Sequence, residues 1–501
     1  MSKQVRVRFA PSPTGPLHIG GVRTALFNYL FAKKNNGVFF LRIEDTDQNR
    51  FVPGAESYIL EALEWLGISP DETIGKNEKF GPYRQSERKH LYKQYANQLI
   101  NSGWAYYAFD TAEALDFHRK QHEEQGKTFI YNHHNREKLD TSLVITNEET
   151  AKRIANGEEY VIRFKTPINE TLHLNDIIRG EVKFDTNLLD DKVLFKSDGM
   201  PTYHLANIVD DHLMETSHVI RGEEWLPSMP LHVLLYRALG WEAPEFAHLP
   251  LILKPIGNGK LSKRDGDKLG FPVFPLEWKS DDGISSGYRE SGFYPEAVIN
   301  FLALLGWNDG TEQELFSLEE LVNKFDLNRV HKAGAKFDPE KNKWFNHHYL
   351  QMQSDVDLAK SYAPFIKSKG ISISEEQLIK LVSLIKERAN FVSEFWSLSD
   401  YFFQAPTFYD EKATKNWKED TGDLMKQLIR VLEGIEDFTS EKIETIVKDW
   451  MTENEIGMGK IMQPFRLSLV GALKGPHLFD IAAFIGKEET ISRIQKVISV
   501  L

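Results

Sequence analysis

A histidine followed closely by two glycines stands where a strand is predicted to pass through a tight loop into a helix. Apolar residues alternate with arginines up to Phe9, prolines and a glycine then stiffen residues 11–16, and helical spacing begins after His18. A helix start offers unpaired N–H groups and a partial positive charge, which favour phosphate. His18 would add a donor, while Gly20 and Gly21 would let a flat ring approach the backbone. The pattern indicates a nucleotide site, with an ordinary strand–helix unit and a proline-rich turn as the alternative.

A second candidate for phosphate chemistry is a basic loop far downstream, Lys260-Leu-Ser-Lys-Arg264. Lys260 and Lys263 could neutralise negative charge that builds on a triphosphate during a reaction. Glycines at 257, 259 and 266 would let the loop close over a ligand. Taken alone, the loop is equally consistent with a solvated basic surface. It gains weight from the histidine–glycine pattern near the N-terminus.

Polar residues at predicted strand ends could bind a ligand that carries a carboxylate. Arg8 and Arg221 each end a predicted strand, where ligands gather in open α/β sheets, and a guanidinium can hold a carboxylate through two hydrogen bonds. Glu44 follows a predicted buried strand, and could instead cap the next helix. Tyr203 and Asn207 lie four residues apart on one face of a predicted helix, where either could simply pack.

Together, His18-Ile-Gly-Gly21 and Lys260–Arg264 resemble the HIGH and KMSKS signatures that bind ATP in class I aminoacyl-tRNA synthetases. The stretches RFAPSPTG, LRIEDTD and HVIRGEEWLPS resemble the glutamyl-tRNA synthetase branch, and the likeness runs along nearly the whole chain. The resemblance implies ATP-dependent ligation of L-glutamate to tRNA-Glu through a glutamyl adenylate, with Mg²⁺ entering with the ATP. It also implies a monomeric, cytoplasmic enzyme.

The resemblance assigns roles to individual residues. It implies a catalytic group that consists of His18, Gly20, Lys260 and Lys263. It implies an ATP site formed by His18, Gly20, Gly21, Glu224, Trp225 and Lys263. It implies a glutamate site formed by Arg8, Ser12, Glu44, Tyr203, Asn207 and Arg221, with Glu44 near the α-amino group.

The order of the predicted elements indicates an α/β Rossmann-type catalytic domain, an inserted α+β acceptor-binding domain and an all-helical C-terminal half. In the family it resembles, the insertion holds the acceptor end of tRNA and the helical half binds the anticodon. We expect the catalytic domain at 1–103 and 190–255, the insertion at 104–189, the KMSKS-type loop and stem-contact domain at 256–327, and the helical region at 328–501 with a break near 370–405. We expect the last strand before the basic loop at 249–253. Residues 265–289 are predicted to form a loop, a surface insertion without an assigned role.

The C-terminal half shows one helical pattern after another, including predicted helices at 421–432, 440–451 and 464–473. A helical region here is typical of bacterial glutamyl enzymes, whereas glutaminyl enzymes carry β-barrels. Candidate anticodon contacts are Arg388, Lys460 and Arg466, with plain surface charges as an equally good interpretation.

The insertion departs from many members of the family at a zinc site. Where a Cys-x-Cys often stands, this chain has Ala108 and Asp110, and it contains no cysteine. His118 and His122 have the spacing that lets two imidazoles share a helix face and hold a metal, and another histidine pair stands at 133–134. Because thiolates are lacking, we favour a solvated helix and expect no zinc.

The composition suits a globular protein of several domains, with 501 residues, 41% hydrophobic and 27% charged. The lack of cysteine excludes disulfides and thiolate metal sites, and no apolar run approaches the length of a membrane span. A net charge of −12 argues against bulk attraction to nucleic acid but leaves room for a local basic face. Two alternatives stay open: a non-discriminating enzyme that also charges tRNA-Gln, and a non-catalytic tRNA-binding paralogue.

Overall fold

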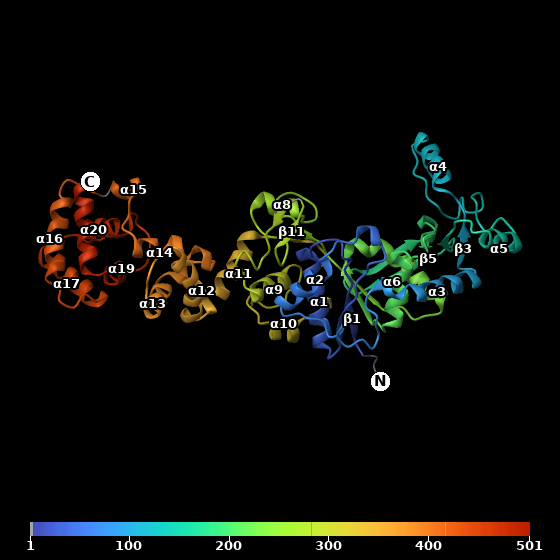
Figure 1. Ribbon diagram of the computed structural model, residues 1–501, viewed down its shortest axis with the longest axis horizontal. Helices are drawn as coiled ribbons and strands as arrows, with labels where there is room; N and C mark the ends of the chain where they lie inside the picture. The colour runs from blue at the N-terminus through green and yellow to red at the C-terminus, as the bar shows by residue number, and fades with distance from the viewer. Residues whose placement is uncertain (1–3, 282, 416) are drawn as a thin grey trace. The chain divides into compact units, whose positions relative to one another are not determined.

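The computed structural model describes residues 4–281, 283–415 and 417–501, and the chain divides into two compact units between Asn342 and Lys343. Figure 1 follows the chain through both units. The strands are β1 (Arg6–Phe9), β2 (Val38–Leu41), β3 (Ala105–Ala108), β4 (Val161–Phe164), β5 (Thr171–Asp176), β6 (Gly180–Asp185), β7 (Val193–Phe195), β8 (His218–Gly222), β9 (Glu245–Leu249), β10 (Ile252–Leu253), β11 (Trp278–Ser280), β12 (Gly283–Ser285) and β13 (Ala335–Lys336). The helices of the first unit are α1 (Ile19–Lys34), α2 (Ala55–Trp65), α3 (Lys89–Asn101), α4 (Ala112–Glu124), α5 (Asn147–Ala155), α6 (Tyr203–Leu213), α7 (Met229–Leu239), α8 (Lys263–Leu269), α9 (Pro295–Leu304) and α10 (Leu318–Lys324).

The strand, loop and helix at the N-terminus form as the sequence predicts. β1 pairs in parallel with β2, which places Val7 opposite Phe39 in the buried sheet. α1 begins directly after His18 and is tied to β8, because the Asn28 side chain donates a hydrogen bond to the carbonyl of Ile220 at 3.0 Å. This buried bond fixes the helix relative to the strand, so that the start of α1 and the end of β8 face the same cavity.

A four-stranded sheet with the order β6-β5-β9-β8 lies in the first unit. β8 lies beside β1, since the backbone N–H of Ser217 donates to the carbonyl of Arg6 at 2.9 Å. β8 and β9 run parallel, and β5 joins β9 through the pair Asp176–Phe246. β5 and β6, which lie within the predicted insertion range of 104–189, therefore belong to the same sheet as β8.

A small antiparallel sheet has the order β3-β4-β7, and its buried side chains share one hydrophobic core with those of the four-stranded sheet. β3 and α5 are grouped together in Figure 1. The polar centre of the small sheet is the buried Asp191, which accepts a hydrogen bond from the Tyr106 hydroxyl at 2.7 Å and pairs with Arg136 at 3.2 Å. Because a buried carboxylate without partners would be strongly destabilising, these bonds explain how the charge is tolerated inside the sheet domain.

The segment 265–289 is not the surface loop that the sequence predicts. It contains most of α8 and the β11–β12 hairpin, and its apolar residues Phe271, Val273, Phe274 and Leu276 are buried. The carbonyl of Val273 accepts a hydrogen bond from the N–H of Ile19, at the start of α1, over 2.9 Å. The physical reason is the apolar run 271–276, because burying it brings this segment against the N-terminal end of α1.

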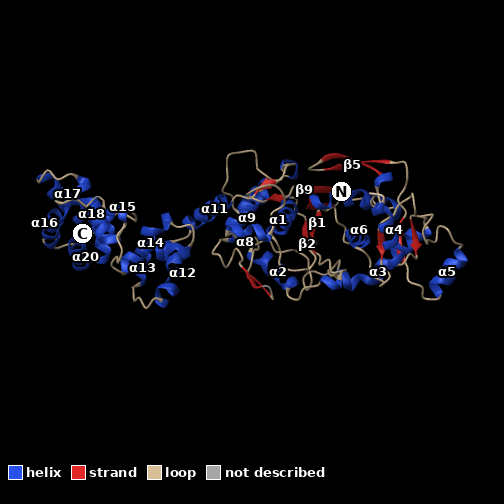
Figure 2. Ribbon diagram, turned by 90° about the horizontal axis from the view of Figure 1, so that it is seen from above, coloured by secondary structure: helices blue, strands red, loops and turns tan. Residues whose placement is uncertain are grey.

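Every regular element that the structure describes between 355 and 500 is a helix (Figure 2). The helices are α12 (Asp355–Ser368), α13 (Glu375–Ile385), α14 (Phe395–Phe403), α15 (Glu411–Thr414), α16 (Thr421–Glu433), α17 (Ser440–Glu453), α18 (Met458–Val470), α19 (Leu478–Ile485) and α20 (Lys487–Val500), while α11 (Pro339–Met352) crosses the boundary between the units. α16, α18 and α20 pack on one another around buried side chains that include Leu428, Phe465 and Ile494. Among the described residues, none of the helices has both the length and the apolarity to cross a membrane.

Two predicted elements have different bounds in the structure. In place of one strand over 249–253, β9 and β10 are separated by Pro250, whose nitrogen has no hydrogen to donate to a strand ladder. In place of a helix over 464–473, α18 begins at Met458 and contains Pro464 in its middle. Proline is common at helix starts, which is why the sequence pattern favoured the later start.

Candidate active site

The starts of α1 and β10 and the ends of β1 and β8 line one cavity of about 370 Å³. The predicted site residues in its wall are Arg8, Ser12, His18, Gly20, Gly21, Glu44, Tyr203, Asn207, Arg221, Glu224, Trp225 and Lys260. Lys263 lies outside that wall, as the exposed first residue of α8. The fold thus gathers at one place residues that the sequence spreads over more than half of the chain.

His18 caps the N-terminus of α1, and its two ring nitrogens differ in role. Nδ1 accepts a hydrogen bond from the N–H of Gly20 at 3.1 Å, so the neutral ring carries its proton on Nε2. Burial, with a smaller contribution from Lys260, lowers the pKa of His18 to about 4 and favours this neutral form. Nε2 is buried and has no hydrogen-bond partner among the described residues. A buried donor without a partner at a helix start suits a phosphate oxygen.

The two glycines after His18 meet different surroundings. A side chain at Gly21 would place its Cβ 2.6 Å from Leu17 Cδ1, so the Leu17 side chain would have to shift to make room for it. At Gly20 a Cβ would lie 3.5 Å from His18 Nδ1, which is ordinary contact. Both glycines line the cavity, and the ligand role predicted for them stays a prediction.

Lys260 and Glu224 form an ion pair in the cavity wall, with Nζ 2.7 Å from Oε1. Their side chains are 56% and 41% exposed. Glu224 folds back over Gly222, where a Cβ would lie 2.1 Å from its carboxylate oxygen. Because an exposed ion pair contributes little to stability, a charged ligand could replace it at small cost.

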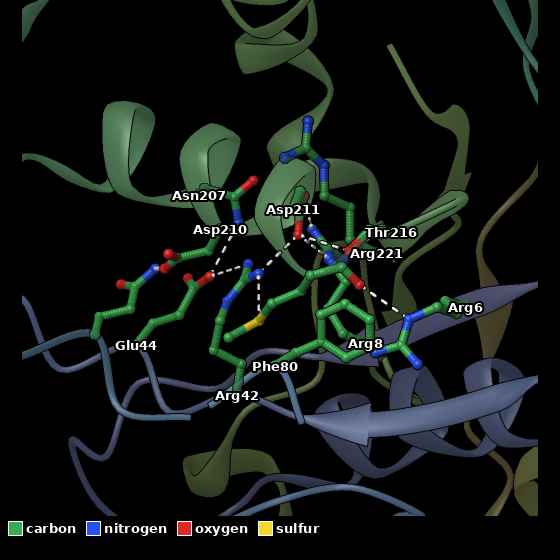
Figure 3. Close-up of polar contacts among 12 residues, drawn as sticks. Arg6, Arg8, Arg42, Glu44, Phe80, Asn207, Asp210, Asp211, Thr216 and Arg221 are labelled. Atoms are coloured by element: carbon green, nitrogen blue, oxygen red, sulfur yellow. Dashed lines mark hydrogen bonds and ion pairs between the residues drawn. The ribbon is translucent and has the colours of Figure 1, made fainter. Parts of the chain in front are cut away.

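A closed network of buried charges and one amide lies against the cavity and reaches its wall through Arg8, Glu44 and Asn207 (Figure 3). Its members are Arg8, Arg42, Glu44, Asn207 and Asp211. Arg8 donates to both oxygens of Asp211, at 2.9 and 3.1 Å, and Arg42 donates to the same carboxylate at 2.8 Å. Oε1 of Glu44 accepts hydrogen bonds from Arg42 and Asn207, both at 2.9 Å. Burial alone would raise the pKa of Asp211, but the two arginines outweigh it and hold the pKa below its usual value.

Arg221 reaches the same cavity with different partners. Its Nε donates to His248 Nε2 at 3.0 Å, while its Nη1 donates to the Tyr203 hydroxyl at 3.1 Å and lies 3.3 Å from His232 Nδ1. Its Nη2 donates to the carbonyl of Trp225 at 3.3 Å. Among the described residues, no carboxylate forms an ion pair with Arg221. The closed network contains as many carboxylates as arginines, and Lys260 is paired with Glu224. Arg221 and Arg23, which donates to the carbonyls of Leu305 and Pro250, therefore leave the cavity wall with an excess of positive charge.

Sequence reasoning missed several buried polar residues that build this site. They are Arg42, Asp176, Asp211, His232 and His248. Two of them had a signal in the sequence. Asp176 follows Leu172 and Leu174 on the buried face of β5, where a carboxylate needs a partner, and Asp211 lies one turn after Asn207 on the predicted helix.

The histidines of the predicted insertion do not gather around a metal site in the described part of the chain. His118 stacks on Phe129 with ring centroids 5.7 Å apart, and His122 Nδ1 lies 2.7 Å from the carbonyl of His118. Asp110 accepts a hydrogen bond from the Tyr131 hydroxyl at 2.7 Å. No three histidine or carboxylate side chains of the described residues lie close enough to hold a metal ion. The absence of zinc from the working enzyme stays a prediction.

The three basic residues predicted to contact an anticodon have different surroundings. Arg466 is half-buried and donates to the carbonyls of Lys474 and Pro476, at 3.1 and 2.7 Å. Arg388 and Lys460 are exposed. Arg466 therefore has a structural task in holding a turn, whereas Arg388 and Lys460 are open to solvent, Lys460 within an exposed ion pair with Asp420.

Comparison with known proteins places these observations in a family. A family profile described as tRNA synthetases class I (E and Q), catalytic domain, matches residues 4–344, and one described as anticodon binding domain matches 356–498. Over its full length the chain is 83% identical to the glutamate–tRNA ligase of Flavobacterium johnsoniae and 58% identical to that of Bacteroides fragilis, of which it covers 100% and 99%. It also superposes on the crystal structure of a glutamate tRNA ligase from Elizabethkingia meningosepticum in complex with its amino acid, at 53% identity, full coverage of both chains and a TM-score of 0.95. The chain belongs to the class I tRNA synthetases of the E and Q group.

Proposed function

We propose that the chain uses ATP to ligate L-glutamate to tRNA-Glu through a glutamyl adenylate. Its relatives of high identity are glutamate–tRNA ligases. The observation that carries the proposal is a single cavity that contains both the unpartnered Nε2 donor of His18 and the uncompensated charge of Arg221. The first group suits a phosphate oxygen and the second suits a side-chain carboxylate.

In the proposed first step, a carboxylate oxygen of glutamate attacks the α-phosphorus of ATP and the bond to pyrophosphate breaks. His18 Nε2 would donate to a phosphate oxygen on which negative charge builds. Lys260 would leave its ion pair with Glu224 to neutralise the triphosphate, and closure of the loop would bring Lys263 to it. Gly20, Gly21 and Trp225 complete the proposed ATP site. Mg²⁺ bound through the ATP oxygens would supply further charge neutralisation.

The amino acid would lie between Arg221 and Glu44. Arg221 and the Tyr203 hydroxyl would bind its side-chain carboxylate. Oε1 of Glu44 is committed within the closed network, so the other oxygen of Glu44, with Ser12, would take the α-amino group. Glutamine would leave the buried Arg221 charge uncompensated, which should reject it by more than the ~1–3 kcal/mol of a methylene difference.

In the second step, a terminal ribose hydroxyl of the tRNA attacks the carbonyl carbon of the adenylate and AMP leaves. The predicted insertion at 104–189 would hold the acceptor end of the tRNA. The helical unit, matched by the anticodon binding domain, would hold the anticodon, with exposed Arg388 and Lys460 as proposed contacts and a lesser role for Arg466. Because one chain supplies the cavity and both proposed tRNA-binding regions, we propose that it acts as a monomer. We propose the cytoplasm as its location.

Charging of separate tRNA-Glu and tRNA-Gln transcripts with labelled glutamate and ATP tests the proposal, with glutamine as the control amino acid. We expect glutamate on tRNA-Glu alone, and glutamate on both transcripts would identify a non-discriminating enzyme. A Lys263→Ala variant should lose activation of glutamate while it retains binding of tRNA. If neither transcript is charged, the ligase proposal is wrong and a tRNA-binding protein without catalysis takes its place.

A further inference from the structure

Arg221 stands in the middle of a chain of hydrogen-bonding side chains that no predicted role includes. On one side, His248 accepts from Arg221 Nε, and His248 Nδ1 lies 2.6 Å from Asp176 Oδ2. On the other side, His232 Nδ1 lies 3.3 Å from Arg221 Nη1, and His232 Nε2 lies 3.2 Å from His204 Nδ1. Asp176, His232 and His248 are buried and do not line the cavity. They can therefore act on a ligand only through the residues that they contact, namely Arg221 and, for His232, also the ring of Tyr203 at 5.7 Å between centroids.

The hydrogen bonds of His248 allow one position for its proton. A guanidinium only donates, so Nε2 of His248 must accept and Nδ1 must carry the hydrogen. That hydrogen points at Asp176, whose Oδ1 accepts the backbone N–H groups of Ile178 and Arg179 at 3.0 and 2.8 Å. Burial lowers the pKa of His248 although Asp176 opposes it. Asp176 thus fixes the tautomer of His248. The His248 ring lies between the Asp176 carboxylate and Arg221, so the two charged groups do not form a direct ion pair.

The same reasoning applies to His232. Its Nδ1 faces a donor, so it accepts, and its Nε2 carries the hydrogen toward His204. Burial, followed by the charge of Arg221, holds the pKa of His232 well below its usual range. The other acceptors around the guanidinium, the Tyr203 hydroxyl and the Trp225 carbonyl, are also uncharged. These acceptors therefore fix the orientation of the Arg221 guanidinium without neutralising its charge.

We propose that His248 and His232 are positioning residues that determine specificity. As neutral acceptors they orient Arg221 without cancelling its charge, which stays available for the side-chain carboxylate of the amino acid. Asp176 sets the tautomer of His248. This inference rests on the proposed function. A carboxylate in place of either imidazole would orient the guanidinium equally well but would cancel its charge, and the cavity would lose its preference for an acidic side chain.

The orientation step is tested at His248 with two variants in the full chain. Gln places an acceptor near the position of Nε2 and keeps the bond to Arg221, whereas Asn reaches only the position of Nδ1 and keeps the bond to Asp176. In charging of tRNA-Glu, His248→Asn should raise the KM for glutamate about 10- to 100-fold, the effect of losing a hydrogen bond to a charged group. His248→Gln should raise it less. The KM for ATP and kcat should change far less in both variants, which a general structural defect would not allow.

The charge step is tested at His232 with Asn and Asp, which have the same shape and differ in charge. His232→Asp should weaken glutamate more than His232→Asn does, and should lower the ratio of kcat/KM for glutamate to kcat/KM for glutamine. Equal glutamate KM values for His232→Asn and His232→Asp, or for His248→Asn and His248→Gln, would overturn the inference. If the unmodified chain charges no tRNA with glutamate, the proposed function itself fails, so the two failures are distinguishable.

Discussion

Two arginines reach the same cavity from the ends of neighbouring strands, and they are held in opposite ways. Arg8 is bonded to both oxygens of Asp211 inside the closed network (Figure 3). Arg221 is instead held by neutral acceptors. Their burial is almost the same, with 3% and 5% of the residue exposed. The cost of desolvation is therefore similar, but only Arg8 is compensated within the protein. The difference teaches that a buried arginine indicates an anion site when no internal carboxylate pairs with it.

The largest expected effect is a loss of stability when the carboxylate partner of Arg8 is replaced. Asp211→Asn would leave Arg8 and Arg42 with only Glu44 as an anionic partner. Breaking a buried ion pair by removing one partner should lower the free energy of unfolding by about 3–5 kcal/mol. Urea unfolding followed by circular dichroism measures the loss.

An exposed ion pair supplies the control for that measurement. Asp116 pairs with Arg119 on α4, where both side chains are more than half exposed. Asp116→Asn should change the unfolding free energy by no more than ~1 kcal/mol. If Asp211→Asn behaves like this control, the closed network does not stabilise the fold and the contrast with Arg221 disappears.

The next largest effect should fall on the rate rather than on the fold, at His18. His18→Asn keeps a good N-cap, since its side-chain oxygen can still accept from the N–H of Gly20, but it removes the Nε2 donor. Loss of one donor to the developing phosphate charge should lower kcat by roughly 10²–10³. Single-turnover formation of the adenylate, with tRNA present, measures this loss. A parallel fall in the unfolding free energy would show that His18 acts through the fold instead.

A smaller effect should appear as the pH falls, because the cavity relies on neutral histidines. The pKa of His18 is about 4 in the folded chain, below its ordinary value of 6.5. Between these values the unfolded chain binds a proton that the folded chain does not, so stability is lost as the pH falls below 6.5. For this one group the loss between pH 7 and pH 5 is about 2 kcal/mol. Urea unfolding at pH 7 and pH 5 measures the loss of unfolding free energy in the unmodified chain and in His18→Asn. The loss should be smaller in His18→Asn by about 2 kcal/mol.

Local signals predicted the elements that carry these groups. Prolines, glycines and apolar spacing act over a few residues, and they were enough to place the strand, loop and helix around His18. Strand-end position likewise identified Arg8 and Arg221. These signals do not distinguish the two arginines, however, because each sequence neighbourhood shows only a cation at the end of a strand.

The partners could not be predicted, because they come from distant parts of the chain. Asp211 is 203 positions from Arg8, and the hydrogen bond from His248 to Asp176 spans 72 positions. The apolar run at 271–276 was mistaken for part of a surface loop, since a short segment without helical or strand periodicity gives no indication of what it packs against. The sequence therefore identified the side chains that would contact ligands better than it identified the partners that hold those side chains in place.

The smallest expected effect extends the contrast to the helical unit, where charge is paired but exposed. Lys460 and Asp420 form an ion pair at 2.7 Å with 62% and 53% of their side chains exposed. Lys460→Ala should change the unfolding free energy by no more than ~1 kcal/mol, while it raises the KM for tRNA and leaves the KM values for glutamate and ATP as they are. Asp420→Asn is the matched control, because it removes the same ion pair and keeps the cation. Equal tRNA KM values in the two variants would show that Lys460 is a surface charge and that the anticodon is bound elsewhere in the unit.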